Sequence, residues 1–133
     1  MKKLIGFSVL IVILAFTSCK NKTENDAIKV VTSEEMQTLL EMDEVQLLDV
    51  RTPEEYAEGY IADFQNIDFL SPTFEQDILK LDKDIPVILY CRSGTRSASC
   101  AQKMVDAGFT KIYDLQGGIS KWEHDGHEIV MPK

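Results

Sequence analysis

The feature that most constrains the fold is an unbroken apolar run at residues 85–90, Ile-Pro-Val-Ile-Leu-Tyr. A strand with one face in water alternates apolar and polar residues, so this run predicts a strand that is buried on both faces. Strands of this kind belong to parallel sheets that helices cover on both sides. Residues 45–50 are a second, nearly continuous apolar run, with Asp49 near its end. We therefore expect an α/β fold with a mostly parallel central sheet.

The rest of the domain alternates between strand and helix patterns. Thr32 followed by Glu35 is a capping-box pattern, and Pro53 suits the first turn of a helix. Predicted strands lie at residues 28–31, 45–50, 66–68, 85–90 and 111–115. The first predicted helix runs from Thr32 to about residue 42. The other predicted helices cover residues 53–58, 73–81, a long stretch that ends at Gly108, and 118–124. Ligands bind at the carboxyl ends of the strands in such sheets, where Asp49, Arg51 and Cys91 are expected to lie.

The N-terminal residues have the pattern of an export signal. Residues 1–3 are Met-Lys-Lys, and the apolar stretch 4–16 is shorter than the ~20 residues of a membrane-spanning helix. The sequence Phe-Thr-Ser-Cys at 16–19 resembles the lipobox of bacterial lipoproteins. We expect residues 1–18 to be a signal peptide and Cys19 to become the lipidated first residue. A plain cleavable signal and an uncleaved anchor are the alternatives.

The remaining chain divides into a tether and one domain. Residues 19–27 are polar and aperiodic, which predicts a flexible tether, and the domain then spans residues 28–133. Without the signal peptide, 12 Lys and Arg stand against 22 Asp and Glu, a net charge of −10. This charge argues against nucleic-acid binding and against adhesion to anionic lipid. We therefore expect a cell-envelope location, with the domain in the periplasm or at the cell surface and lipid on Cys19 as its membrane contact.

The segment after the buried strand carries the candidate chemistry. Cys91 follows the strand directly, and a helix begins within about five residues, after Gly94. Backbone N–H groups and the positive end of the helix dipole stabilise a thiolate in such a place. Arg92 and Arg96 add two cations to an acidic protein. The sequence predicts an anion-binding cup with a nucleophile at its base, and its binding residues are Arg92, Ser93, Gly94, Thr95 and Arg96.

Four separated motifs resemble the rhodanese family of single-domain sulfurtransferases. They are Cys-Arg-Ser-Gly-Thr-Arg-Ser at 91–97, Asp-Val-Arg at 49–51 with Glu-Glu-Tyr at 54–56, Gly-Tyr-Ile at 59–61, and Leu-Gln-Gly-Gly-Ile at 115–119 with Trp122. The resemblance spans roughly residues 28–130. It implies a rhodanese-like fold with helices on both faces of the sheet.

The resemblance also implies a reaction. Cys91 takes sulfane sulfur from a small anionic donor such as thiosulfate, holds it as a persulfide, and passes it to cyanide, a thiol or a protein acceptor. No metal or organic cofactor is required. No CxxC pair occurs, and both histidines lie near the end of the chain, so the sequence offers no zinc spacing.

Other functions stay open beside this one. Related cysteine phosphatases place five residues between Cys and Arg, whereas Cys91 and Arg96 enclose four, a tighter cup that favours a sulfane-sulfur donor. Arsenate reduction is a further alternative within related folds. The alternative from a different class is a sulfur-carrier or redox partner module that delivers sulfur without turnover.

The supporting residues have expected roles as well. Family precedent suggests that Asp49 and Arg51 brace the site, with Arg51 paired to a carboxylate such as Glu55. Arg96 is expected to point toward the loop, and a pair with a surface carboxylate is its alternative. Cys100 is expected to be a small buried hydrophobe, and a resolving thiol is the alternative.

Overall fold

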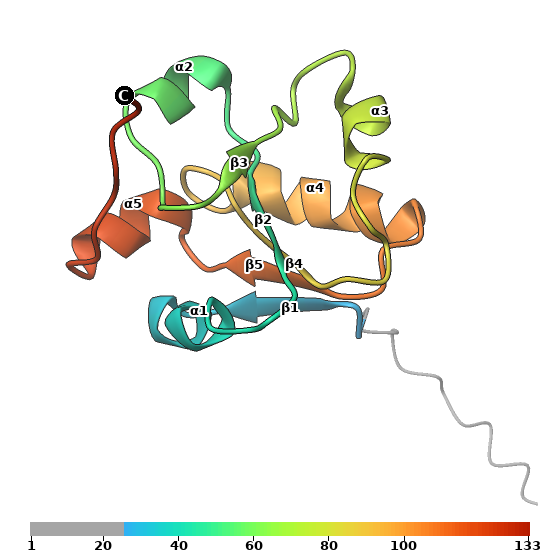
Figure 1. The fold of residues 1–133 in the computed structure, drawn as a ribbon, viewed down its shortest axis with the longest axis horizontal. Coiled ribbons are helices and arrows are strands. Elements are labelled where there is room, and N and C mark those ends of the chain that lie inside the picture. The colour runs from blue at the N-terminus through green and yellow to red at the C-terminus, as the bar shows by residue number, and fades with distance from the viewer. Residues whose placement is uncertain (1–25) are drawn as a thin grey trace, which may run out of the picture.

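The structure is a computed structural model, and it describes residues 26–133. Strands and helices alternate along the chain, as the sequence predicts (Figure 1). The strands are β1 (Ile28–Val31), β2 (Gln46–Asp49), β3 (Gln65–Asn66), β4 (Val87–Tyr90) and β5 (Ile112–Leu115). The helices are α1 (Ser33–Leu39), α2 (Pro53–Ala57), α3 (Phe74–Ile78), α4 (Thr95–Asp106) and α5 (Gly118–His124).

All strands lie in one sheet and every pair in it is parallel, which confirms the predicted α/β class. The strand order is β1-β5-β4-β2-β3. β4 is the middle strand, and all four of its residues are buried. The register pairs Asp49 with Tyr90, so the carboxyl ends of β2 and β4 lie side by side. This edge of the sheet is where Cys91 begins the next segment.

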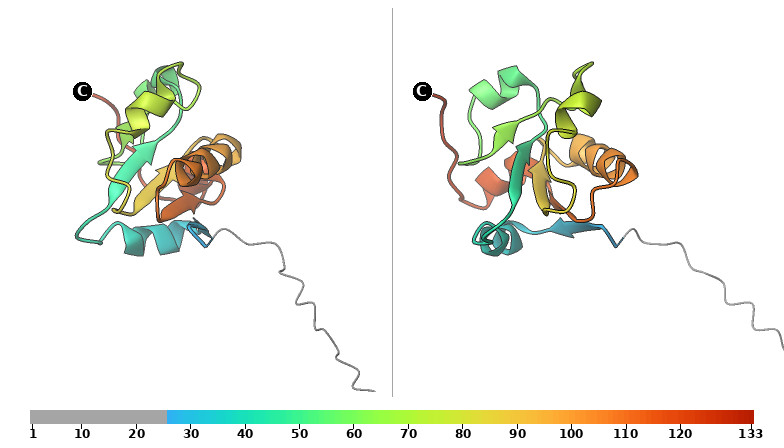
Figure 2. Two further views of the ribbon diagram at one scale, coloured as in Figure 1. Left: turned by 90° about the vertical axis from the view of Figure 1, so that its right-hand side faces the viewer. Right: turned by 45° about the vertical axis from the view of Figure 1, so that its right-hand side comes forward.

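Helices cover both faces of the sheet, as predicted (Figure 2). Val87 and Leu89 face a core built with α3 and α4, whereas Ile88 and Tyr90 face a second core built with α1 and α5. Successive side chains of a strand point to opposite faces of the sheet. When helices cover both faces, every position of the strand is therefore buried and apolar. The first core also contains Cys91 and is therefore the one that reaches the site.

Local sequence signals explain where the helices begin. Thr32 and Thr52 cap α1 and α2, and in each case the glutamate three residues later closes a capping box. α1 ends earlier than predicted, at Leu39, because Glu41 and Met42 bond to carbonyls three residues back, and three-residue turns are tighter than an α-helix. α3 ends at Ile78 for the same reason, since Leu81 bonds to the Ile78 carbonyl.

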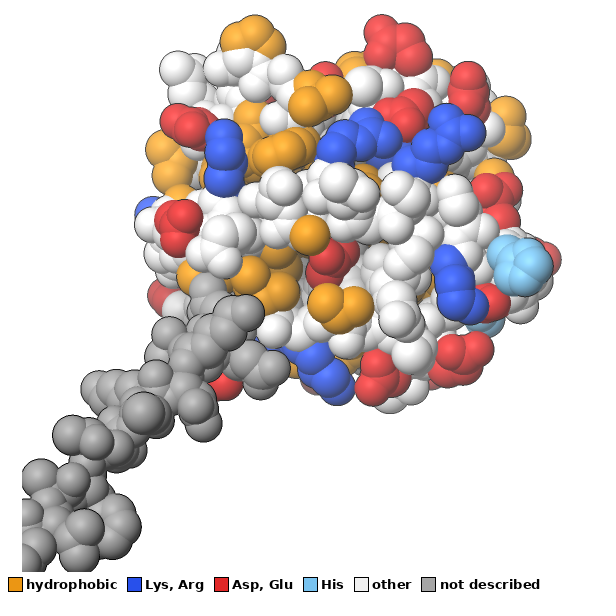
Figure 3. All heavy atoms as spheres, turned by 180° about the vertical axis from the view of Figure 1, so that it is seen from behind, with side chains coloured by type: hydrophobic (Ala, Val, Ile, Leu, Met, Phe, Trp, Pro, Cys, Tyr) orange, Lys and Arg blue, Asp and Glu red, His pale blue; other side chains and the backbone are white. Residues whose placement is uncertain are grey.

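The predicted signal peptide at residues 1–18, Cys19 and most of the tether lie outside the described residues. None of the helices between residues 26 and 133 has the length and apolar character needed to cross a bilayer. The C-terminal segment returns to the neighbourhood of α2 (Figure 1), and its Val130 forms an antiparallel bridge with Tyr60, which follows that helix. One face of the molecule carries acidic and basic side chains intermixed with apolar ones (Figure 3).

Candidate functional site

The cysteine loop, residues 91–96, connects β4 to α4. Cys91 is 1% exposed and has its backbone at the sheet edge beside the end of β2. Gly94 is the N-cap of α4 with φ of +107°, a value that L side chains adopt only under strain. The twelve-residue helix α4 therefore starts only four residues after the thiol. This tight connection places the N-terminus of α4 against the sulfur atom.

The Sγ atom of Cys91 has two hydrogen-bond partners. The Gly94 N–H donates to it at 3.1 Å, and the thiol donates to the Ser97 hydroxyl oxygen at 3.4 Å. Burial is the largest influence on the pKa of Cys91 and acts to raise it. Hydrogen bonds from the Ser97 side chain and from the backbone of Ser97, Gly94 and Ser93 together outweigh burial, so the pKa is lowered. The thiolate of this buried sulfur atom therefore forms more readily than that of an ordinary cysteine.

Some of the other side chains of the predicted anion-binding cup form hydrogen bonds within the protein and others do not. Arg92, Ser93 and Thr95 are exposed, and their side chains make no hydrogen bond within residues 26–133. Arg96 takes the alternative arrangement: its guanidinium donates to both carboxylate oxygens of Glu55, at 2.7 and 2.8 Å. The pair connects α4 to α2, so Arg96 anchors the rim of the loop to the neighbouring helix.

Glu55 receives more than this ion pair. The Thr52 N–H and hydroxyl both donate to the same carboxylate, at 3.1 Å each. The Arg96 hydrogen bonds lower the pKa of Glu55 to about 2, against a smaller opposing effect of burial and with help from Thr52. Glu55 is therefore ionised at neutral pH and holds Arg96 in place.

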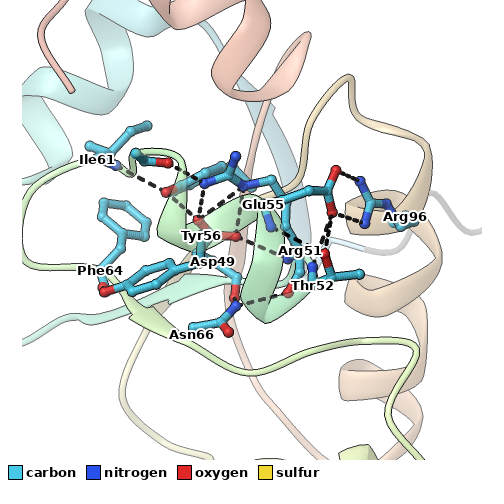
Figure 4. Close-up of polar contacts among 11 residues, drawn as sticks. Asp49, Arg51, Thr52, Glu55, Tyr56, Ile61, Phe64, Asn66 and Arg96 are labelled. Atoms are coloured by element: carbon cyan, nitrogen blue, oxygen red, sulfur yellow. Dashed lines mark hydrogen bonds and ion pairs between the residues drawn. The ribbon is translucent and has the colours of Figure 1, made fainter. Parts of the chain in front are cut away.

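Arg51 pairs with a carboxylate, as predicted, but the carboxylate is Asp49 and not Glu55, the suggested partner (Figure 4). Its Nη2 donates to Asp49 Oδ2 and to the Gly59 carbonyl, both at 2.7 Å, and its backbone N–H donates to Asp49 Oδ1. The Tyr90 hydroxyl donates to the same carboxylate at 2.6 Å. Asp49 and Arg51 are both buried, so they brace the strand ends as expected but as a pair of their own.

The start of α5 supports the cysteine loop from behind. The Ile119 N–H donates to the Cys91 carbonyl at 2.9 Å, and the Ser120 N–H donates to the Arg92 carbonyl at 3.1 Å. Gly118, with φ of +60°, permits this approach, since a Cβ there would lie 2.6 Å from the Arg92 carbonyl group. The sequence suggests a tight turn at Gly117 and Gly118, and the structure shows in addition that Gly118 contacts the cysteine loop.

Sequence reasoning missed Ser97 and Asp114. Ser97 is fully buried, and its hydroxyl contacts the sulfur atom of Cys91. Its position in the first turn of the helix that follows Cys91 is the sequence feature that could have identified it. Asp114 is 4% exposed, and its Oδ1 has no hydrogen-bond partner. Burial raises its pKa to about 6, despite an opposing hydrogen bond from Ser97. The sequence feature that could have identified Asp114 is a carboxylate within an otherwise apolar predicted strand.

The second cysteine and the histidines stand apart from this chemistry. Cys100 is fully buried in the core, as expected of a small hydrophobe. Burial, then the charges of Asp114 and Cys91, raise its pKa to about 12. The Gln37 side-chain amide N–H donates to Nδ1 of His127 at 3.1 Å, and the imidazole lies against Trp122. No group of three or more His, Cys, Asp or Glu in residues 26–133 is arranged to hold a metal ion.

Comparisons with known proteins find relatives of this chain. A family model described as the rhodanese-like domain matches residues 32–125. A protein named sulfurtransferase from Allochromatium vinosum is 37% identical over 98 residues, which cover 73% of this chain and 89% of the relative. A thiosulfate sulfurtransferase GlpE from Stutzerimonas stutzeri is 37% identical over 79 residues, or 59% of this chain and 70% of the relative.

Solved structures show the same fold. A rhodanese-like domain protein from Staphylococcus aureus superimposes with a TM-score of 0.66 and 30% identity, over 79% of this chain and 99% of its own. A rhodanese-related protein from Thermoplasma volcanium gives a TM-score of 0.69 and 26% identity, over 78% and 99% of the two chains.

Proposed function

The chain belongs to the rhodanese-like domain family, and from this premise we propose that it is a sulfurtransferase that carries sulfane sulfur as a persulfide on Cys91. The donor is a small anion such as thiosulfate, and the acceptor is cyanide or a thiol. The observation that carries the proposal is the environment of Sγ, which accepts the Gly94 N–H at 3.1 Å and lies 3.4 Å from the Ser97 hydroxyl at the start of α4.

The first half of the reaction loads the sulfur. The Cys91 thiolate attacks the outer sulfur of thiosulfate, a new S–S bond forms, and sulfite leaves with the electron pair of the broken S–S bond. The donors around Sγ favour the thiolate that begins this step. The N-terminus of α4 and the exposed Arg92 supply positive potential where the anionic donor arrives.

The second half releases the sulfur. The acceptor attacks the outer sulfur of the persulfide, and the bond to Cys91 breaks with its electron pair on Sγ. The Gly94 N–H and the Ser97 hydroxyl stabilise this leaving thiolate as they stabilise the attacking one. Leaving groups of lower pKa depart faster, so the same lowered pKa serves both halves.

Mass spectrometry of the thiosulfate-treated full-length protein tests the proposal. The wild type should gain one sulfur atom on Cys91, the Cys91→Ser variant should gain none, and the Cys100→Ser variant should load like the wild type. Added cyanide should then remove the sulfur and yield thiocyanate over many turnovers. Loading without turnover would support the sulfur-carrier or redox partner module instead, and a protein that never loads would contradict both.

We also propose that the domain is anchored in the cell envelope through lipid on Cys19. Support comes from the basic start, the apolar stretch and the Phe-Thr-Ser-Cys junction. Metabolic labelling with a fatty acid should mark the wild type and leave the Cys19→Ala variant unlabelled, with Cys100→Ala as the matched cysteine control. Equal labelling of the wild type and the Cys19→Ala variant would refute the anchor.

A further inference from the structure

A cavity of about 230 Å³ lies next to the cysteine loop, between α2, α5 and the C-terminal segment. Arg92 of the loop and Ser120 of α5 line it, and their backbones are joined by the bond from the Ser120 N–H to the Arg92 carbonyl. Glu55, Glu58, Glu123 and Arg51 complete its polar wall. The cavity is smaller than the pockets that take drug-sized ligands, so it suits a molecule of amino-acid size.

The charges that line the cavity are not neutralised by one another. Arg92, Glu58 and Glu123 form no ion pair within residues 26–133. The nearby Glu55 differs, because Arg96 already binds both of its oxygens. The cavity therefore offers one free cation and two free carboxylates.

Arg51 adds a buried donor to the same wall. Its side chain is 7% exposed; Nε donates to Asp49, and Nη2 donates to Asp49 and to the Gly59 carbonyl. Its Nη1 makes no hydrogen bond within the part of the chain that the structure describes, although Arg51 lines the cavity. Nη1 is not among the fully buried atoms that lack a partner, so it is open to the cavity and free to donate to a ligand acceptor such as a carboxylate.

Resting on the proposed function, we propose that this cavity binds the amino-acid part of a small zwitterionic thiol, which is the sulfur acceptor. A simple anion would meet two unpaired carboxylates, and a simple cation would leave Arg92 and Nη1 of Arg51 without an acceptor. A ligand with both charges satisfies all of them: its carboxylate lies at Arg92 and Nη1 of Arg51, and its ammonium lies at Glu58 and Glu123.

Transfer to such a ligand is a balanced exchange. The thiolate of the acceptor attacks the outer sulfur of the Cys91 persulfide and forms a new S–S bond. The bond between that sulfur and Cys91 breaks, its electron pair stays on Sγ, and the acceptor leaves as a persulfide. No oxidant or reductant is consumed. Because Arg92 directly follows Cys91, the bound acceptor lies beside the loop that carries the sulfur.

Single-turnover transfer from the loaded full-length protein tests the pocket. The acceptors are L-cysteine, which carries both charges, cysteamine, which lacks the carboxylate, and 3-mercaptopropionate, which lacks the ammonium. The double variant Glu58→Gln/Glu123→Gln should slow transfer to L-cysteine by about tenfold at low concentration, since each exposed charge pair is worth up to ~1 kcal/mol. Transfer to 3-mercaptopropionate should not slow, and the control Glu54→Gln, in the helix that Glu58 caps, should behave as wild type.

A binding measurement separates this inference from the proposed function. In the Cys91→Ser variant, which cannot load, L-cysteine should produce saturable amide shifts at Gly59, Ser120 and Glu123 in an NMR titration. Cysteamine and 3-mercaptopropionate should give weaker effects at equal concentration. Absent or equal shifts for the three thiols would overturn the pocket even if Cys91 loads with sulfur, and saturable binding in a protein that never loads would overturn only its role in transfer.

Discussion

Cys91 and Cys100 are two thiols in one hydrophobic core, with 1% and 0% of their surfaces exposed, and yet their pKa values move in opposite directions. Burial raises both values and is the largest influence on each. Cys91 has the Gly94 N–H and the Ser97 hydroxyl beside its sulfur atom, whereas no hydrogen bond to Cys100 is found within residues 26–133. The local donors, rather than exposure, decide which thiol is reactive.

Selective alkylation is the strongest test of this contrast. At neutral pH, iodoacetamide should modify Cys91 at least about 100-fold faster than Cys100, because only Cys91 is stabilised as a thiolate and Cys100 reacts only when the core opens. Peptide mapping of the modified protein gives the two rates. In concentrated urea they should converge, and similar rates in the native protein would abolish the contrast.

Gly118→Ala should lower the reactivity of Cys91 but not that of Cys100. The added Cβ would overlap the Arg92 carbonyl group, 2.6 Å away, and the residue would keep a positive φ. We expect a loss of about 2–4 kcal/mol in the free energy of unfolding, in the range of overpacking plus backbone strain, and slower alkylation of Cys91. Urea unfolding measures the first effect.

Gly126→Ala is the matched control for this variant. Gly126 also has a positive φ, of +88°, but a Cβ there would meet no atom within 4 Å. It should cost only the backbone strain, about 1 kcal/mol, and leave Cys91 reactive. Equal costs for the two variants would show that contact with the cysteine loop is unimportant.

Ser97→Ala should reduce the difference in alkylation rate between Cys91 and Cys100. Loss of the hydroxyl removes the first of the hydrogen bonds that lower the pKa of Cys91, so its alkylation at neutral pH should slow by about tenfold, the equivalent of one pKa unit. The pH dependence of the alkylation rate measures this shift. Ser99→Ala, on the exposed side of α4, should leave the profile in place.

Asp114→Asn should give the smallest change, and its sign depends on pH. The pKa of Asp114 is about 6 in the folded protein against an ordinary value of 3.8. Its contribution to stability is therefore full below pH 4 and is lost as the pH rises through about 6. The variant should be more stable than wild type at pH 8 by about 1 kcal/mol, less than the shift alone implies because the amide is buried too. Urea unfolding at pH 4 and pH 8 tests this.

Much of the fold could be predicted because its signals are local. The apolar run before Cys91 identified the central strand, and the Thr32–Glu35 pair and Pro53 indicated two helix starts. The position of Cys91 at the sheet edge followed from these elements together. Such features depend on residues close in sequence, which a single chain displays directly.

The choice of partner among several charges is harder to predict. Asp49 and Arg51 are two residues apart, and their pairing leaves Glu55 free for Arg96, 41 positions later. The sequence alone does not show which carboxylate each arginine takes. Ser97 is a milder case, since a helix directs its side chains back toward its N-terminus and so toward the thiol.

The bonds from Ile119 and Ser120 to the cysteine loop have a consequence for how the protein is made. The thiol is translated well before the segment that fixes the loop around it. A chain in which α5 has not yet folded holds Cys91 without this support, so the loop around the sulfur atom is complete only when nearly the whole domain has formed.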